Sequence, residues 1–133
     1  MMKEVFNNID FYKKALDGIS LRNTIISHNI ANANTPNYKR KLVVFEDQLK
    51  EAIEKRQVPM KTTHEKHISN RKIGFQPKIL EDKSLSYRID GNNVNIDTET
   101  AELAKNQIMY NALINQVIGE FDKIKNVITE GSK

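Results

Sequence analysis

The sequence predicts a mainly α-helical protein in which long N- and C-terminal helices pair as a coiled-coil-like hairpin around a small irregular or β-hairpin middle segment. Near both chain ends, apolar residues recur every three or four positions, which is the heptad spacing of helices that pack along a narrow seam. Between the two ends that spacing is lost, and polar and turn-forming residues dominate. We therefore expect one axial domain over 1–133, with an N-terminal helix in 1–35, a middle segment in 36–96 and a C-terminal helix in 97–131.

The N-terminal helix carries one line of apolar residues at heptad spacing. Asn23 interrupts this line at a core-type position, where a buried asparagine can fix the register of paired helices, although a partly exposed seam would explain it equally well. Asn7 or Asn8 can cap the start of the helix. Pro36 disfavours helical backbone at Thr35, so the helix is expected to end before it. The residues expected to form the seam here are Ile9, Leu16, Ile19, Ile26 and Ile30.

The middle segment is expected to hold a short helix from about 44 to 56. Phe45 and Leu49 begin an apolar helical face, and Pro59 follows it. Residues 57–70 are polar and are interpreted as an exposed loop. His64 and His67 could share a helix face there, but a metal site needs three or four converging ligands, so we expect no metal.

Two short runs after this loop alternate apolar and polar residues with the period of strands. They are residues 73–75 and 85–89, and the polar residues 81–84 between them could form the turn of a small hairpin. Two strands alone are marginal in water, so this hairpin needs packing from elsewhere.

The C-terminal helix is expected to begin at Asp97, a good N-cap, and to end near Gly131. Its apolar residues again alternate by three and four, with Gln107 as the polar exception. Further apolar residues flank both seams, and a two-helix hairpin cannot cover them all, which predicts a protein–protein surface and self-association in a helical assembly. The residues expected to form the seam here are Leu103, Tyr110, Ile114, Val117, Phe121, Ile124 and Ile128.

Composition narrows the classes of function. The chain has 133 residues, no cysteine and a net charge of +4, so thiolate chemistry is excluded. No run of 18 apolar residues predicts a membrane span, and the first 20 residues lack the apolar core of a cleavable signal peptide. No phosphate loop or nucleophile–base spacing predicts a catalytic site, and we expect no enzyme activity and no cofactor.

One basic cluster, residues 38–41, motivates the alternative of a basic helical nucleic-acid-binding protein. The other positive charges are scattered along the chain, and no block of five like charges occurs. Such a distribution is typical of a solvated surface, so we expect no nucleic-acid partner.

Two motifs at opposite ends of the chain resemble those of flagellar rod and hook axial proteins. The first is the run Asn29-Ile30-Ala31-Asn32-Ala33-Asn34-Thr35-Pro36-Asn37-Tyr38-Lys39, similar to the N-terminal signature of that family. The second begins Asp90-Gly91-Asn92-Asn93-Val94 and is similar to the sequence that precedes the C-terminal helix of proximal rod subunits. Asn37 replaces a usual glycine, which asparagine can do because it accepts positive φ.

The resemblance implies a structural subunit of the proximal rod of the flagellar basal body, with other rod subunits, the basal-body ring and the export gate as partners. Another rod or hook subunit of the family is the alternative. It also implies export without a cleavable signal peptide. Phe45 and Leu49 resemble the Phe-x-x-x-hydrophobic element by which such subunits engage the export gate, although core packing explains the same two residues.

Overall fold

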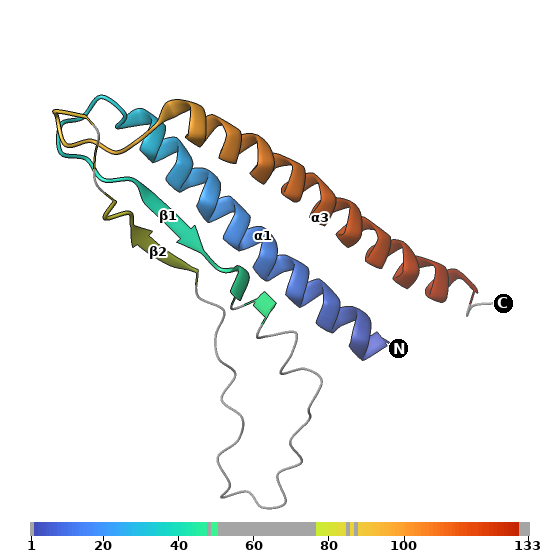
Figure 1. Ribbon diagram of the computed structural model, residues 1–133. Coiled ribbons are helices and arrows are strands. Elements are labelled where there is room, and N and C mark those ends of the chain that lie inside the picture. Colours follow the sequence, from blue (N-terminus) through green and yellow to red (C-terminus); the bar gives the residue numbers. More distant parts are fainter. Residues whose placement is uncertain (1, 48, 51–76, 85, 87, 131–133) are drawn as a thin grey trace, which may run out of the picture.

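The computed structural model describes residues 2–47, 49–50, 77–84, 86 and 88–130. Two long antiparallel helices, α1 (Met2–Ala31) and α3 (Ile96–Glu130), lie side by side, and their free ends point the same way (Figure 1). Strands β1 (Lys41–Val44) and β2 (Lys78–Glu81) form a two-stranded antiparallel sheet that contacts α1 through β1. The predicted fold class, a mainly α hairpin with a small β element in the middle, is confirmed.

Helix α1 begins earlier than its expected caps. It starts at Met2, so Asn7 and Asn8 lie inside it and the predicted N-cap was wrong. Its end follows the prediction more closely, because the last helical residue is Ala31 and a tight turn follows. The Asn32 side-chain Nδ2 donates to the His28 carbonyl at 2.8 Å, which satisfies one of the carbonyl groups left open at a helix C-terminus.

The core of the protein lies where β1 packs against α1. Ile19, Val43 and Phe45 are buried, and the Phe45 ring lies directly on Gly18 of α1 with the Arg22 guanidinium 4.5 Å from its centroid. Around this cluster pack five partly buried residues: Leu21, Ile25, Leu49, Met109 and Leu113.

The short helix expected from about 44 was wrong at its start. Val44 is the last residue of β1, and helical backbone begins only at Glu46, with the Leu49 amide donating to the Phe45 carbonyl at 3.0 Å. Residues 51–56 of that prediction lie outside the described part of the chain. The apolar spacing was real, but β1 takes its first residues because Val43 and Phe45 both reach the core from an extended segment.

The predicted hairpin between 73–75 and 85–89 was also wrong. β2 pairs with β1, in a register that places Val43 opposite Ile79, and Glu81 of the expected turn is the last residue of β2. Ile89 is fully exposed and belongs to no strand. Residues 73–75, 85 and 87 lie outside the described residues. The two strands that the structure describes, 41–44 and 78–81, are therefore not the runs that alternation marked.

The contact between α1 and α3 contains polar residues at heptad spacing. Glu99, Asn106 and Glu120 of α3 are buried, and half-buried Leu113 occupies the heptad position between the last two. Asn106 donates from Nδ2 to the Ile19 carbonyl at 3.0 Å and to Asn23 Oδ1 at 2.7 Å. Asn23, which interrupts the apolar line of α1, therefore has an amide partner on the facing helix.

The start of α3 differs by two residues from the prediction. Asn95 is the N-cap, because its Oδ1 accepts from the amides of Asp97 at 2.9 Å and Thr98 at 3.3 Å. Asp97 lies instead in the first turn, where its charge favours the positive end of the helix. Within the described chain, neither helix is long and apolar enough to cross a membrane.

The contact between Gly18 and Phe45 generates a first prediction. An added Cβ on Gly18 would lie 2.8 Å from the Phe45 ring, whereas one on Gly119 would meet nothing within 4 Å. Overpacking costs about 1–3 kcal/mol, more than the roughly 0.5–1 kcal/mol that alanine gains over glycine in a helix. Gly18→Ala is expected to lower the free energy of unfolding in urea, and the matched Gly119→Ala to raise it. Stabilisation by both would contradict the close approach.

The paired amides generate a second prediction. Asn106→Leu removes one amide and leaves Asn23 Oδ1 unpaired, which is expected to cost about 1–3 kcal/mol of unfolding free energy. Asn23→Leu/Asn106→Leu removes both amides and should recover most of that loss, because an apolar pair suits a helix seam. Urea unfolding of both single variants and the double variant gives the coupling energy. Additive losses would show that the two amides act independently.

Candidate functional site

The two motifs at opposite ends of the sequence meet at the closed end of the helical hairpin. Asn92, which is completely buried, lies at the centre of this contact. Its Nδ2 is within hydrogen-bond distance of the carbonyls of Asn32 at 2.9 Å, Ala33 at 3.1 Å and Thr35 at 2.9 Å, and its Oδ1 accepts from the Val94 amide at 2.8 Å. One side chain of the second motif thus holds three backbone carbonyls of the first.

Two residues with positive φ bring the turns of the motifs together. Asn37 has φ 59° and its amide donates to the Asp90 carbonyl at 2.8 Å, while Gly91 has φ 74°. Glycine suits this position because of its positive φ, and a Cβ there would also lie 2.8 Å from the Asn37 side-chain Oδ1. The tolerance of asparagine for positive φ, expected from the sequence, is confirmed at Asn37. Lys39 Nζ and Arg88 Nη1 add hydrogen bonds to the carbonyls of Gly91 at 2.7 Å and Ala33 at 2.9 Å.

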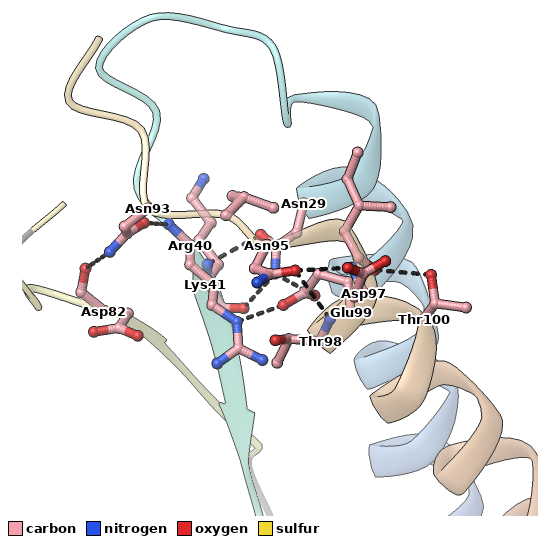
Figure 2. Close-up of polar contacts among 12 residues, drawn as sticks. Asn29, Arg40, Lys41, Asp82, Asn93, Asn95, Asp97, Thr98, Glu99 and Thr100 are labelled. Atoms are coloured by element: carbon pink, nitrogen blue, oxygen red, sulfur yellow. Dashed lines mark hydrogen bonds and ion pairs between the residues drawn. The ribbon is translucent and has the colours of Figure 1, made fainter. Parts of the chain in front are cut away.

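Asn29 joins α1 to β1 and α3 (Figure 2). Its side-chain amide exchanges two hydrogen bonds with the backbone of Lys41, accepting from the amide at 3.0 Å and donating to the carbonyl at 2.8 Å. Nδ2 also donates to Glu99 Oε2 at 3.0 Å. Asn29 therefore pairs with β1 much as a neighbouring strand would, on the side of β1 opposite to β2.

Glu99 is the buried charge of this cluster, and Arg40 is its ion-pair partner through Nε. The Arg40 amide donates to Asn93 Oδ1 at 2.7 Å, which extends the network to the second motif (Figure 2). Tyr38 donates to Asn29 Oδ1 at 3.3 Å; burial, together with the negative charge of Glu99, raises the pKa of its hydroxyl. We call Asn29, Arg40, Asn92, Asn93 and Glu99 the polar junction.

The polar junction is suited to positioning backbone. Its amide and carboxylate groups are directed at one another and at backbone groups, and its buried negative charge is neutralised by an arginine. Among the residues that the structure describes, no three histidine or acidic side chains converge closely enough to hold a metal ion. His64 and His67 lie outside these residues.

The remaining residues of the first motif form the turn at this end of the hairpin. Ile30 is half-buried, and the exposed residues are Ala31, Asn34, Thr35 and Pro36. Two members of the polar junction were not predicted. Glu99 was not singled out, and Arg40 was interpreted as part of a solvated basic cluster. The one sequence signal for Glu99 was its heptad spacing with Asn106, seven residues on.

The predicted seam residues divide into two groups. Ile19 and Ile26 are buried, and the half-buried residues are Ile9, Leu16, Ile30, Leu103, Ile114, Val117 and Ile124. Tyr110, Phe121 and Ile128 are 37%, 54% and 61% exposed, respectively. These three lie beside the contact with α1, because the buried positions of α3 are those of Asn106 and Glu120.

Four exposed residues and half-buried Ile114 form an apolar stripe along the side of α3. Its members follow one another at helical spacing of three, four or seven residues, which keeps them on one face. We call this set the α3 flank: Tyr110, Ile114, Ile118, Phe121 and Ile128. The proposed export residues lie elsewhere, with Phe45 buried in the core and Leu49 half-buried beside it.

Comparison with known proteins identifies the family of this chain. The family model "Flagella basal body rod protein" matches residues 20–39, which span the end of α1 and all of the first motif. The chain is 36% identical to the flagellar basal body rod protein FlgB of Bacillus subtilis (strain 168), over 90% of this chain and 91% of that protein. It is 33% identical to FlgB of Aquifex aeolicus (strain VF5), over 94% and 95% of the two chains.

A third relative, FlgB of Borreliella burgdorferi, is 34% identical over 96% of this chain and 99% of its own. These similarities run through both helices and both motifs. The chain belongs to the FlgB family of flagellar basal body rod proteins.

Proposed function

We propose that this chain is a structural subunit of the proximal rod of the flagellar basal body, built into the rod through its hairpin of terminal helices, with the outer side of α3 as the main contact surface. Its partners are then copies of itself and other rod subunits, with the basal-body ring and the export gate as neighbours. The role is mechanical: the subunit forms part of the wall of a rotating shaft.

The observation that carries this proposal is the α3 flank. Ile118, Phe121 and Ile128 are each more than half exposed, on a helix about 50 Å long. A row of large apolar side chains in contact with water is characteristic of surfaces that bind other proteins. The outward face of α1, by contrast, presents polar side chains such as Lys13, Asp17 and Thr24. The hairpin therefore has one side suited to burial in an assembly.

The polar junction supports the same role. A subunit that transmits torque needs a fixed angle between its helices, and hydrogen bonds between charged and amide groups specify geometry more strictly than apolar contacts do. Glu99 and Asn29 supply such a contact between α1 and α3.

The α3 flank generates a prediction for assembly. Ile118→Asp is expected to leave the fold unchanged, because Ile118 is 52% exposed, and to abolish motility by placing an unpaired carboxylate in a buried contact of the rod. The control Asn115→Asp adds the same charge at an exposed position off the stripe and should remain motile. The measurements are swimming and rod structures in purified basal bodies, for variants present as the sole copy. Normal rods with Ile118→Asp would contradict burial of this flank.

We further propose that Phe45 and Leu49 serve as an export element before the chain folds. In the folded subunit Phe45 is 1% exposed, so a receptor could reach its ring only on an unfolded chain. The same burial gives Phe45 a role in stability, and a test has to separate the two roles.

Phe45→Ala and Gly18→Ala separate export from packing. Both disturb the same contact, but only Phe45→Ala removes the aromatic side chain from the chain that is exported. We expect reduced secretion with normal cellular abundance for Phe45→Ala, and normal secretion for Gly18→Ala. Equal loss of secretion or of abundance in both variants would assign Phe45 to packing alone.

A further inference from the structure

The outer edge of β2 has no partner strand among the residues that the structure describes. β1 lies between α1 and β2, and β2 pairs on its inner side with β1 (Figure 1). Two large apolar side chains of β2 are in contact with water, since Ile79 is 49% and Leu80 is 50% exposed. A strand edge of this kind is a surface to which a further strand can be added.

The contacts of β1 determine which backbone groups of β2 point outward. Lys41 and Val43 direct backbone groups at side chains of α1, and therefore away from β2. In an antiparallel pair, directly opposite residues turn their hydrogen-bonding groups either toward each other or away from each other. Glu81 lies opposite Lys41, and Ile79 lies opposite Val43. The amides and carbonyls of Ile79 and Glu81 therefore face outward from the sheet.

A second copy of β2 fits this edge in one register better than in others. Outward groups must meet outward groups, so an antiparallel pairing within residues 79–81 is centred on Ile79, Leu80 or Glu81. Centring on Glu81 places two like charges opposite each other, and centring on Ile79 places Lys78 opposite Leu80. Centring on Leu80 places Lys78 of each copy opposite Asp82 of the other. Opposite charges directly across two strands stabilise their pairing, so the edge is self-complementary about Leu80.

The register about Leu80 also continues an apolar row across the sheet. Leu80 lies directly opposite Leu42 of β1, so the two side chains share one face. Two copies joined at Leu80 place both pairs of leucines in a single row across four strands. Two strands alone are marginal in water, and a sheet of four strands with an apolar row is more stable.

We propose that two copies of the chain, before they enter the rod, pair antiparallel through the outer edges of β2, about Leu80, to form one four-stranded sheet. Both copies use the same surface, so the contact closes as a dimer and cannot extend a rod. It is separate from the α3 flank. The proposal goes beyond the proposed function, because it concerns the subunit outside the rod.

The absence of native cysteine allows a direct test. In the proposed register Leu80 meets its counterpart in a non-hydrogen-bonded pair, whose Cα atoms are about 4.5 Å apart, within the range of a disulfide. Ile79 lies diagonally to its counterpart, about 7–8 Å away, which is too far for a disulfide. Mild oxidation of the purified full-length chain is expected to give a covalent dimer for Leu80→Cys. The equally exposed control Ile79→Cys should remain monomeric on a non-reducing denaturing gel.

Both cysteine variants are also made with Ile118→Asp, which removes association through the α3 flank. The covalent dimer of Leu80→Cys is expected to persist, because the sheet edge and the flank are different surfaces. Loss of the dimer with Ile118→Asp would assign the association to the flank and overturn the proposal.

A charge reversal tests the same contact without cysteine. Lys78→Glu places like charges opposite each other at both ends of the paired edge, and is expected to raise the dimer dissociation constant several-fold in analytical ultracentrifugation. The control Lys13→Glu makes the same change of charge at an exposed position on α1 and should leave the constant unchanged. Equal effects of the two substitutions would contradict the pairing of Lys78 with Asp82.

Two further results would overturn the proposal. Trapping of Ile79→Cys as readily as Leu80→Cys would show either another register or random collision. A folded Leu80→Cys chain that gives no covalent dimer would reject pairing at this edge. Swimming and rod structure are scored separately, so either result would leave the proposed function standing.

Discussion

The contact between Asn29 and Glu99 is the constraint on which the rest of the subunit depends. Asn29 comes from the end of α1 and Glu99 from the start of α3. Their hydrogen bond therefore joins the two helices at the closed end of the hairpin. The same asparagine pairs with Lys41 and so fixes β1 against α1, while Glu99 neutralises Arg40. One buried amide and one buried carboxylate thus set the relative positions of three elements.

A buried contact of this kind provides geometry more than stability. The desolvation of Glu99 and Arg40 offsets much of their attraction, and the amide pair between Asn23 and Asn106 replaces apolar contact in the middle of the seam. The α1–α3 interface is therefore specific in register but limited in apolar burial. The apolar cluster around Phe45 is assembled where β1 packs against α1, and Met109 and Leu113 of α3 pack against it.

This distribution of polar contacts inside and apolar side chains outside suits a subunit of a rod. Large apolar side chains on α3 remain in contact with water in the single chain, and association with neighbours stabilises whatever they cover. In the proposed assembly, fixed geometry inside the subunit and apolar surface outside it are complementary requirements: the first would define where each neighbour lies, and the second would bind it. The exposed turn of the first motif stands at the closed end of the hairpin, where it is accessible to neighbours.

The sequence by itself determined the two long helices, the turn that follows α1, and the family. Heptad spacing is a local property that survives in any environment, and the residues Asn37 and Gly91 match backbone conformations that few other residues accept.

The pairing of β1 with β2 and the burial of Glu99 were decided only in the tertiary structure. Strand partners are chosen by contacts between distant segments, and a glutamate in a first helical turn looks the same in sequence whether it faces water or Arg40. The predicted seam of α3 includes residues that are exposed in the single chain, because apolar spacing marks a face without identifying the buried positions. The polar residues Asn106 and Glu120 are buried on α3: the facing helix supplies an amide to Asn106, and Lys123 of α3 itself pairs with Glu120.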